Sequence, residues 1–117
     1  MLLRLTQRYP DVVADVSVDQ FRREPGSHQL VGTLVLTDGS SVHVKDYSFR
    51  GGARKYSYHW RSAEGQFIGR WDNAPHWSEV KSHPHHFHDG SEGHVTDSNV
   101  RCLEDLLELL RDRLAGQ

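Results

Sequence analysis

The chain has a single cysteine, Cys102, among its 117 residues. One thiol cannot form an intramolecular disulfide or supply a zinc site built from thiolates. A long apolar run is also lacking, because charged residues interrupt even the leucine-rich stretch 103–114, so we expect no transmembrane helix. Residues 1–10 carry two arginines within a short apolar run and do not resemble a signal peptide. These absences favour a cytoplasmic protein in a reducing compartment.

Net charge is also small, −2 with neutral histidines, so the chain as a whole is not an electrostatic nucleic-acid binder. Its distribution is uneven. Residues 43–81 hold seven Lys or Arg against four Asp or Glu, and eight of the eleven aromatic residues lie between Tyr47 and Trp77. A basic and aromatic middle can contact a phosphate backbone, although ordinary solvated strands share this composition.

Hydrophobic periodicity predicts an α+β fold, with an antiparallel sheet of four to six strands and a C-terminal amphipathic helix packed on one face. The pairs Asp38-Gly39 and Glu64-Gly65 are typical of hairpin turns. Leucines recur at helical spacing near the C-terminus, where Ser98 or Asn99 can cap the helix. The length predicts a single domain, 1–117. Its expected parts are a sheet in 12–73, a histidine-rich loop in 74–97 and a helix in 98–115.

The second hairpin also predicts a register. With a two-residue turn, Tyr58 faces Trp71 and His59 faces Arg70, which keeps the large aromatic side chains on one face of the sheet. Such a stripe could stack bases, but the chain has little other bulk to bury, so we expect it to belong to the core. The stripe consists of Tyr56, Tyr58, Trp60 and Trp71.

The opposite face of this hairpin gathers groups that suit RNA chemistry. The imidazole of His59 can transfer a proton near neutral pH. The guanidinium groups of Arg61 and Arg70 can hold a phosphate, and Asp72 can orient His59 or His76. A solvated face with Arg–Asp ion pairs is the alternative. The candidate catalytic residues are His59, Arg61, Arg70, Asp72, His76 and His86. The candidate nucleic-acid contacts are Lys55, Tyr58, Arg61, Arg70 and Lys81.

Histidine is concentrated in one segment, because six of the nine histidines lie within residues 76–94. Imidazole nitrogens bind zinc, nickel or copper, and three can suffice for a catalytic site. The spacing leaves three interpretations open: an RNA-facing catalytic loop, a metal site and a plain polar loop. We expect the histidines at 85, 86 and 88 to lie within reach of His59, Arg70 and Asp72. The metal-binding alternative would use His83, His85, His86 and His88.

Three ordered blocks carry a resemblance to a known family: KYSYHW at 55–60, RWDNAPH at 70–76 and HPHHFH at 83–88. With the preceding strand–turn–strand unit and the closing helix, residues 12–110 resemble TumE-type toxins of prokaryotic type II toxin–antitoxin systems. The sequence departs from the family pattern at Trp77, where a His or polar residue is usual. The resemblance implies a cytoplasmic toxin that inhibits growth by RNA cleavage or interference with translation. It also implies a helix-turn-helix antitoxin encoded beside it.

Three functions remain open on the sequence. The first is an RNA-directed toxin, expected to be a metal-independent endoribonuclease that needs no cofactor. The second is a metal-binding or metallohydrolase domain holding zinc or another divalent transition metal. The third is a non-enzymatic interaction module whose acidic helix binds a partner. No membrane partner is expected, and the sequence leaves the RNA target and the oligomeric state open.

Overall fold

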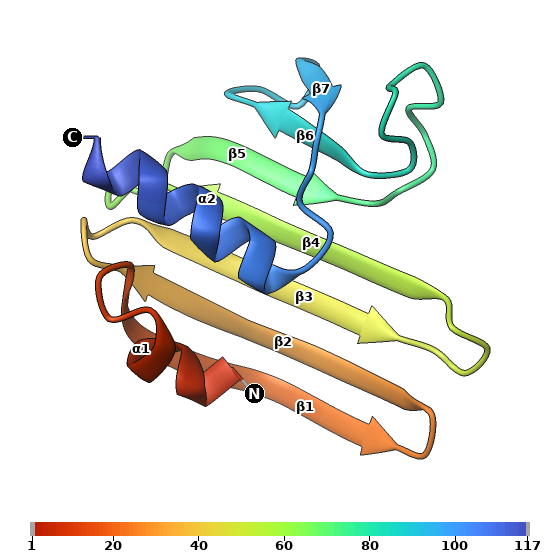
Figure 1. Ribbon diagram of the computed structural model, residues 1–117, viewed down its shortest axis with the longest axis horizontal. Helices are drawn as coiled ribbons and strands as arrows, with labels where there is room; N and C mark the ends of the chain where they lie inside the picture. The colour runs from red at the N-terminus through yellow and green to blue at the C-terminus, as the bar shows by residue number, and fades with distance from the viewer. Residues whose placement is uncertain (1, 117) are drawn as a thin grey trace.

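The fold is a single antiparallel sheet crossed on one side by a helix (Figure 1). The computed structural model describes residues 2–116. The seven strands of this part of the chain pair in sequence order, each antiparallel to the next. The elements are η1 (Leu2–Arg4), α1 (Leu5–Arg8), β1 (Val13–Glu24), β2 (Ser27–Leu36), β3 (Ser41–Ser48), β4 (Arg54–Arg61), β5 (Phe67–Asp72), β6 (His86–Asp89), β7 (Val95–Asp97) and α2 (Leu103–Ala115).

The antiparallel sheet and the C-terminal helix are confirmed, but the expected four to six strands is wrong, because the sheet has seven. The additional strands β6 and β7 lie in 74–97, so that segment is not a loop throughout. Apolar periodicity does not reveal β6 because its buried positions on one face are His86 and His88 rather than apolar residues. Buried strand residues are usually apolar, so a strand whose buried residues are histidines does not show the expected apolar alternation.

Both predicted hairpins form. Asp38-Gly39 joins β2 to β3, with Gly39 at a φ of +90° and Asp38 Oδ1 accepting a hydrogen bond from the Ser40 amide at 2.9 Å. The pairing expected for the β4–β5 hairpin is confirmed, because Tyr58 pairs with Trp71 and His59 with Arg70. The expected two-residue turn is wrong: the Ser62 amide donates to the Gln66 carbonyl at 2.8 Å, and a register shift between Trp60 and Arg61 restores the pairing. Side chains of β4 and β5 therefore lie on the faces that the sequence predicted.

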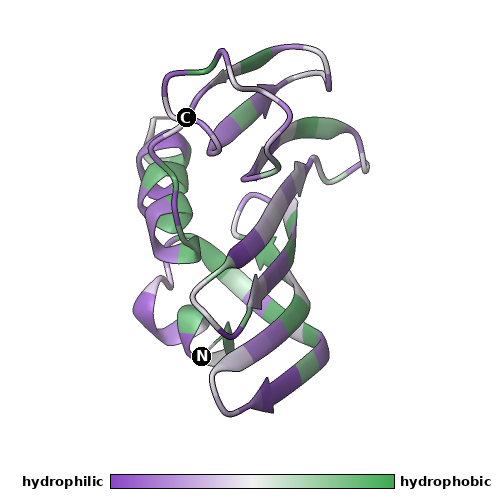
Figure 2. Cartoon of the chain, turned by 90° about the vertical axis from the view of Figure 1, so that its right-hand side faces the viewer, coloured by the Kyte–Doolittle hydropathy of each residue, from purple (hydrophilic) through white to green (hydrophobic). Residues whose placement is uncertain are grey.

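The core lies between the sheet and α2, which crosses in front of β3 to β5 and stands on one side of the strands in the side view (Figures 1 and 2). Leu106, Leu107 and Leu110 of α2 are fully buried, in one cluster with strand residues. Burial of apolar surface of this kind is the main stabilising term of folding. The strand residues of this cluster include Leu34, Val42, Val44, Tyr56, Tyr58, Trp60 and Trp71.

The helix begins later than expected, at Leu103 rather than after Ser98 or Asn99. Ser98 Oγ instead accepts a hydrogen bond from the Val100 amide at 3.1 Å, which holds a turn before the helix. The amide of the residue preceding the N-cap, Arg101, donates to Asp105 Oδ2 at 3.0 Å, so a first-turn carboxylate satisfies it. Within residues 2–116, no helix is both long and apolar enough to cross a membrane.

Candidate functional site

The face of the sheet opposite α2, called here the open face, carries a hollow of about 350 Å³ over β3, β4 and β5. Strand pairing places His43 opposite His59, and His59 opposite Arg70, so two imidazoles and a guanidinium form a row across three strands. Lys45 and Lys55 line the same hollow. Two imidazoles therefore lie among three cationic side chains on a surface that solvent reaches.

His59 has the electrostatic properties of a general base. Partial burial lowers its pKa below the ordinary histidine value, and the charges of Arg61 and Arg70 lower it further. A neutral imidazole can accept a proton near neutral pH. The ring of Phe67 packs edge-on against it, with centroids 5.0 Å apart, and limits its orientation. On the neighbouring strand, His43 Nδ1 lies 3.4 Å from the hydroxyl of Thr33.

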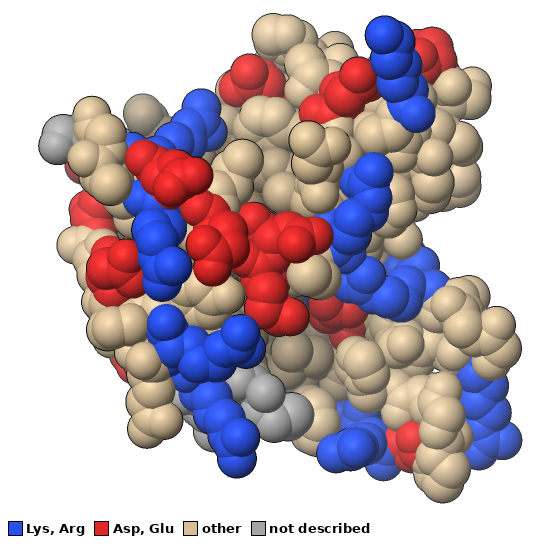
Figure 3. All heavy atoms as spheres, in the orientation of Figure 1, with Lys and Arg blue, Asp and Glu red and all other residues tan. Residues whose placement is uncertain are grey.

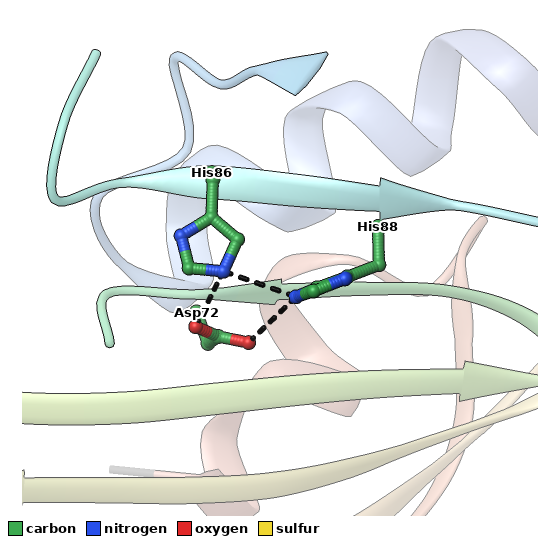
Figure 4. Close-up of side chains that lie close together, drawn as sticks. All are labelled: Asp72, His86 and His88. Atoms are coloured by element: carbon green, nitrogen blue, oxygen red, sulfur yellow. Dashed lines mark hydrogen bonds and ion pairs between the residues drawn. The ribbon is translucent and has the colours of Figure 1, made fainter. Parts of the chain in front are cut away.

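A buried group adjoins the hollow and consists of Asp72, His86 and His88, called here the Asp72 cluster (Figure 4). Pairing of β5 with β6 places His86 opposite Asp72. His86 Nε2 lies 2.9 Å from Asp72 Oδ1 and 3.0 Å from His88 Nε2. His88 Nε2 lies 3.4 Å from Asp72 Oδ2. Together these three side chains could hold a metal ion, because their ligand atoms all lie within 4.8 Å of one another.

Backbone carbonyls orient both imidazoles of the cluster. His86 Nδ1 lies 3.0 Å from the carbonyl oxygen of Pro84, and His88 Nδ1 lies 2.7 Å from that of Glu92. A carbonyl oxygen only accepts hydrogen bonds, so each Nδ1 carries a proton and donates it. The ring of Trp77 packs over both imidazoles, with centroid distances of 6.4 Å and 6.0 Å. The segment before β6 therefore covers the cluster.

Arg70 connects the Asp72 cluster to the hollow. Its Nε donates to Asp72 Oδ2 at 2.9 Å and its NH1 group to Glu92 Oε1 at 2.7 Å. Its NH2 group lies 3.1 Å from His88 Nε2, which can only accept there because a guanidinium has no lone pair to offer. The other carboxylate oxygen, Asp72 Oδ1, also accepts from the Ala74 amide at 3.0 Å.

The structure brings together only some of the residues that the sequence predicted to lie close to one another. His86 and His88 contact Asp72, and His88 also contacts Arg70. His85 lies apart from them, because its Nδ1 is 2.7 Å from the hydroxyl of Tyr56 on the side of the sheet that α2 covers. His83 is exposed. The four histidines of the metal-binding alternative are thus not gathered in one place: His86 and His88 lie together with Asp72, whereas His83 and His85 lie apart from them.

Other candidate residues are also placed differently from the expectation. Asp72 contacts Arg70 and the two buried histidines instead of orienting His59 or His76, and His76 is exposed and is not among the residues lining the hollow. Arg61 and Lys55 are exposed, as nucleic-acid contacts require. Two hollow residues, His43 and Lys45, are absent from the sequence-based candidates. Their pairing depends on the β3–β4 turn, whose geometry the sequence alone does not reveal.

The aromatic stripe is confirmed as core. Tyr58 is 0% exposed and its hydroxyl donates to Asp46 Oδ2 at 2.8 Å, so its ring is closed to a nucleic-acid base and its expected role as a contact is corrected. Lys81 is exposed, and its amide donates to Asp97 Oδ1 at 3.0 Å. It is not among the residues that line the hollow.

Comparison with known families matches residues 2–115 to the family described as toxin TumE. The chain belongs to the TumE toxin family. No curated protein matches it, and neither does any solved structure. The blocks that suggested TumE-type toxins map onto β4, onto the end of β5 with the segment after it, and onto residues 83–88, which include most of β6. For this TumE-family chain, the resemblance is therefore confirmed over nearly its whole length.

Proposed function

We propose that this TumE-family toxin inhibits growth by cleaving RNA in the hollow of the open face, without a metal ion in the reaction. The observation that supports this proposal is the position of His59. It is a partly exposed imidazole with a lowered pKa, opposite both His43 and Arg70 in a hollow that also contains Lys45. A base, a second imidazole as acid and two cations near the phosphate are groups that accelerate RNA transesterification.

The reaction proceeds by proton transfer at two imidazoles. His59 removes the proton of a ribose 2′-hydroxyl, and the 2′-oxygen attacks the adjacent phosphorus. The bond from phosphorus to the 5′-oxygen breaks, and His43 in its protonated form donates a proton to that leaving oxygen. Arg70 and Lys45 hold the phosphate oxygens and stabilise the charge of the transition state. The products are a 2′,3′-cyclic phosphate and a 5′-hydroxyl end.

The charge distribution favours RNA on the open face rather than on the helix side. Asp and Glu side chains gather over α2 on the side seen in Figure 3. Because this acidic surface repels phosphate, a nucleic-acid backbone approaches the sheet from the face that carries Lys45, Lys55 and Arg70. The acidic residues of α2 exposed there are Glu104, Asp105, Glu108 and Asp112.

The direct test is cleavage of a labelled single-stranded RNA by the purified chain in excess EDTA. We expect cleavage to persist in EDTA and to leave a 2′,3′-cyclic phosphate. Loss of one acid–base group costs about 10²- to 10⁴-fold in rate, so His59→Asn should lose activity in that range. His83→Gln is the matched control, because His83 is exposed and lies outside the hollow. Equal cleavage by His59→Asn and the parent would refute the assignment, as would cleavage of a substrate lacking 2′-hydroxyls.

The second test is growth. Expression of the chain should slow a bacterial host, and co-expression of a helix-turn-helix antitoxin encoded beside the toxin gene should relieve the effect. His59→Asn and Arg70→Gln should remove toxicity while circular dichroism shows an unchanged fold. RNA as the target places this action in the cytoplasm. A harmless parent at high expression, confirmed as folded, would contradict the proposal.

A further inference from the structure

We propose that the Asp72 cluster binds one divalent first-row transition metal ion, with zinc the best match to its donors, through Asp72 and the Nε2 atoms of His86 and His88. This site is separate from the acid–base pair of the hollow. Its ligands come from β5 and β6, and β6 is a strand of four residues near the edge of the sheet. A bound ion would therefore link β5 to β6 near the edge of the sheet.

The protons of the two imidazoles are the first argument. Both Nδ1 atoms donate to backbone carbonyls, so in the neutral rings both Nε2 atoms carry lone pairs. These two Nε2 atoms lie 3.0 Å apart. Two lone pairs repel at this distance, so the arrangement is favourable only when a cation, a proton or a metal ion, interacts with both. Carbonyls that hold the far nitrogen of a histidine are the usual supports of metal-ligating imidazoles.

The donor distances are the second argument, because they are close to those of a metal site. Tetrahedral zinc with ligands at about 2.0–2.1 Å has donor atoms about 3.4 Å from one another. In the cluster, His86 Nε2 is 2.9 Å from Asp72 Oδ1, and His88 Nε2 is 3.4 Å from Asp72 Oδ2. To reach the separation of a zinc site, His86 Nε2 would have to move slightly away from Asp72 Oδ1 and from His88 Nε2, which lies 3.0 Å from it. Two imidazoles and one carboxylate are also a donor set that divalent zinc accepts.

Arg70 is the group that opposes a metal ion. Its NH2 group donates to the Nε2 lone pair of His88, which the metal would need, and its charge repels a cation. Arg70 is one-quarter exposed and also bonds to the exposed Glu92, so its planar guanidinium as a whole can turn toward solvent and release His88. Metal and guanidinium therefore compete for His88.

The test is isothermal titration of ZnCl2 into chelator-stripped protein that was purified without a polyhistidine tag. We expect one equivalent of Zn²⁺ to bind, and Asp72→Asn and His88→Gln to abolish this binding. Arg70→Gln should bind Zn²⁺ about tenfold more tightly, because it removes the competing charge. His83→Gln and His94→Gln are matched controls: both residues are exposed histidines of the same segment and should bind like the parent.

Three outcomes would overturn the proposal: no single-equivalent binding by the parent, an equal loss in the control variants, or weaker binding by Arg70→Gln. If His88→Gln does not fold, X-ray absorption of the zinc-loaded parent decides. Two imidazole nitrogens and one carboxylate oxygen at about 2.0–2.2 Å support the site, and any other set of protein ligands contradicts it. No RNA is present in these measurements, so their result is independent of the cleavage proposal.

Discussion

The two faces of the sheet are made by the same strands and differ in almost every property. Toward α2, alternate residues such as Val42, Val44 and Tyr58 are fully buried. On the open face, their neighbours His43, Lys45 and His59 remain accessible and line a polar hollow. One face therefore supplies stability and the other is free to carry chemistry, so substitutions on the two faces should have different consequences.

The comparison has an exception at β5 and β6. There the open face is itself buried, with His86 and His88 only 1% and 3% exposed beneath the segment that contains Trp77. Polar side chains can be buried when hydrogen bonds satisfy them. The open face thus has an exposed part, where a substrate can reach, and a covered part, where a cluster is held in place.

The strongest contrast between the faces should come from truncating a core leucine of α2. Leu106 is fully buried, so Leu106→Ala should reduce the free energy of unfolding by about 2–5 kcal/mol. Ser57→Ala, on the open face, should change it by about 0.5 kcal/mol or less. Urea denaturation measures both. Similar losses in the two variants would show that the faces do not differ as described.

A smaller loss is expected where two strands approach closely. A Cβ added at Gly69 would lie 2.5 Å from the ring of Phe87, which stacks on Trp71 with centroids 4.5 Å apart. Gly69→Ala should therefore destabilise the protein by about 1–3 kcal/mol through overpacking. Gly93→Ala is the matched control, because a Cβ added at Gly93 would have no other atom within 4 Å. Thermal unfolding measures the stability of both variants. Equal unfolding temperatures for Gly69→Ala and Gly93→Ala would show that the packing around Gly69 is looser than this contact indicates.

A buried hydroxyl on the core side should contribute less. Tyr56 Oη donates to the carbonyl of Val100 at 3.0 Å and lies 2.7 Å from His85 Nδ1. Tyr56→Phe leaves both partners without this bond and should cost about 1 kcal/mol. Burial raises the pKa of Tyr56 to about 12 and that of Tyr58 further still, so ultraviolet titration should show more than one tyrosine ionising late, and Tyr56→Phe should remove the contribution that titrates near 12. Loss of a different tyrosine signal would contradict the assignment.

The smallest effect concerns His59 on the open face. Because Arg61 lowers the pKa of His59, Arg61→Gln should raise it, and NMR titration of the imidazole measures the change. A histidine whose folded pKa is below its unfolded pKa binds fewer protons when folded, so His59 reduces stability as the pH falls from its ordinary pKa toward its folded one. This loss should be smaller in Arg61→Gln. Arg22→Gln, remote from the hollow on β1, is the control, and an equal shift there would point to a non-local effect.

Sequence patterns predicted the parts of the molecule that local rules govern. The preference for keeping the aromatic residues on one face predicted the pairing of His59 with Arg70, although a longer turn and an irregularity at Trp60–Arg61 replace the two-residue turn. Alternation identified the aromatic stripe as core, and leucine spacing identified the final helix. These features depend on residues near one another in the chain, whose geometry follows from turn length and the two-residue period of strands.

The gathering of residues from separate segments was decided by the tertiary structure. Pairing of β3 with β4 brought His43 to His59, and pairing of β5 with β6 brought His86 and His88 to Asp72 while turning His85 to the other side. The sequence by itself determined strands β1 to β5 and the C-terminal helix, because these follow from short-range periodicity and turn residues. It also determined the family, through its three ordered blocks. Which histidines meet depends on the strand registers across the glycine-rich turn 49–53 and the longer connection 73–85, which no hydrophobic pattern in the sequence reveals.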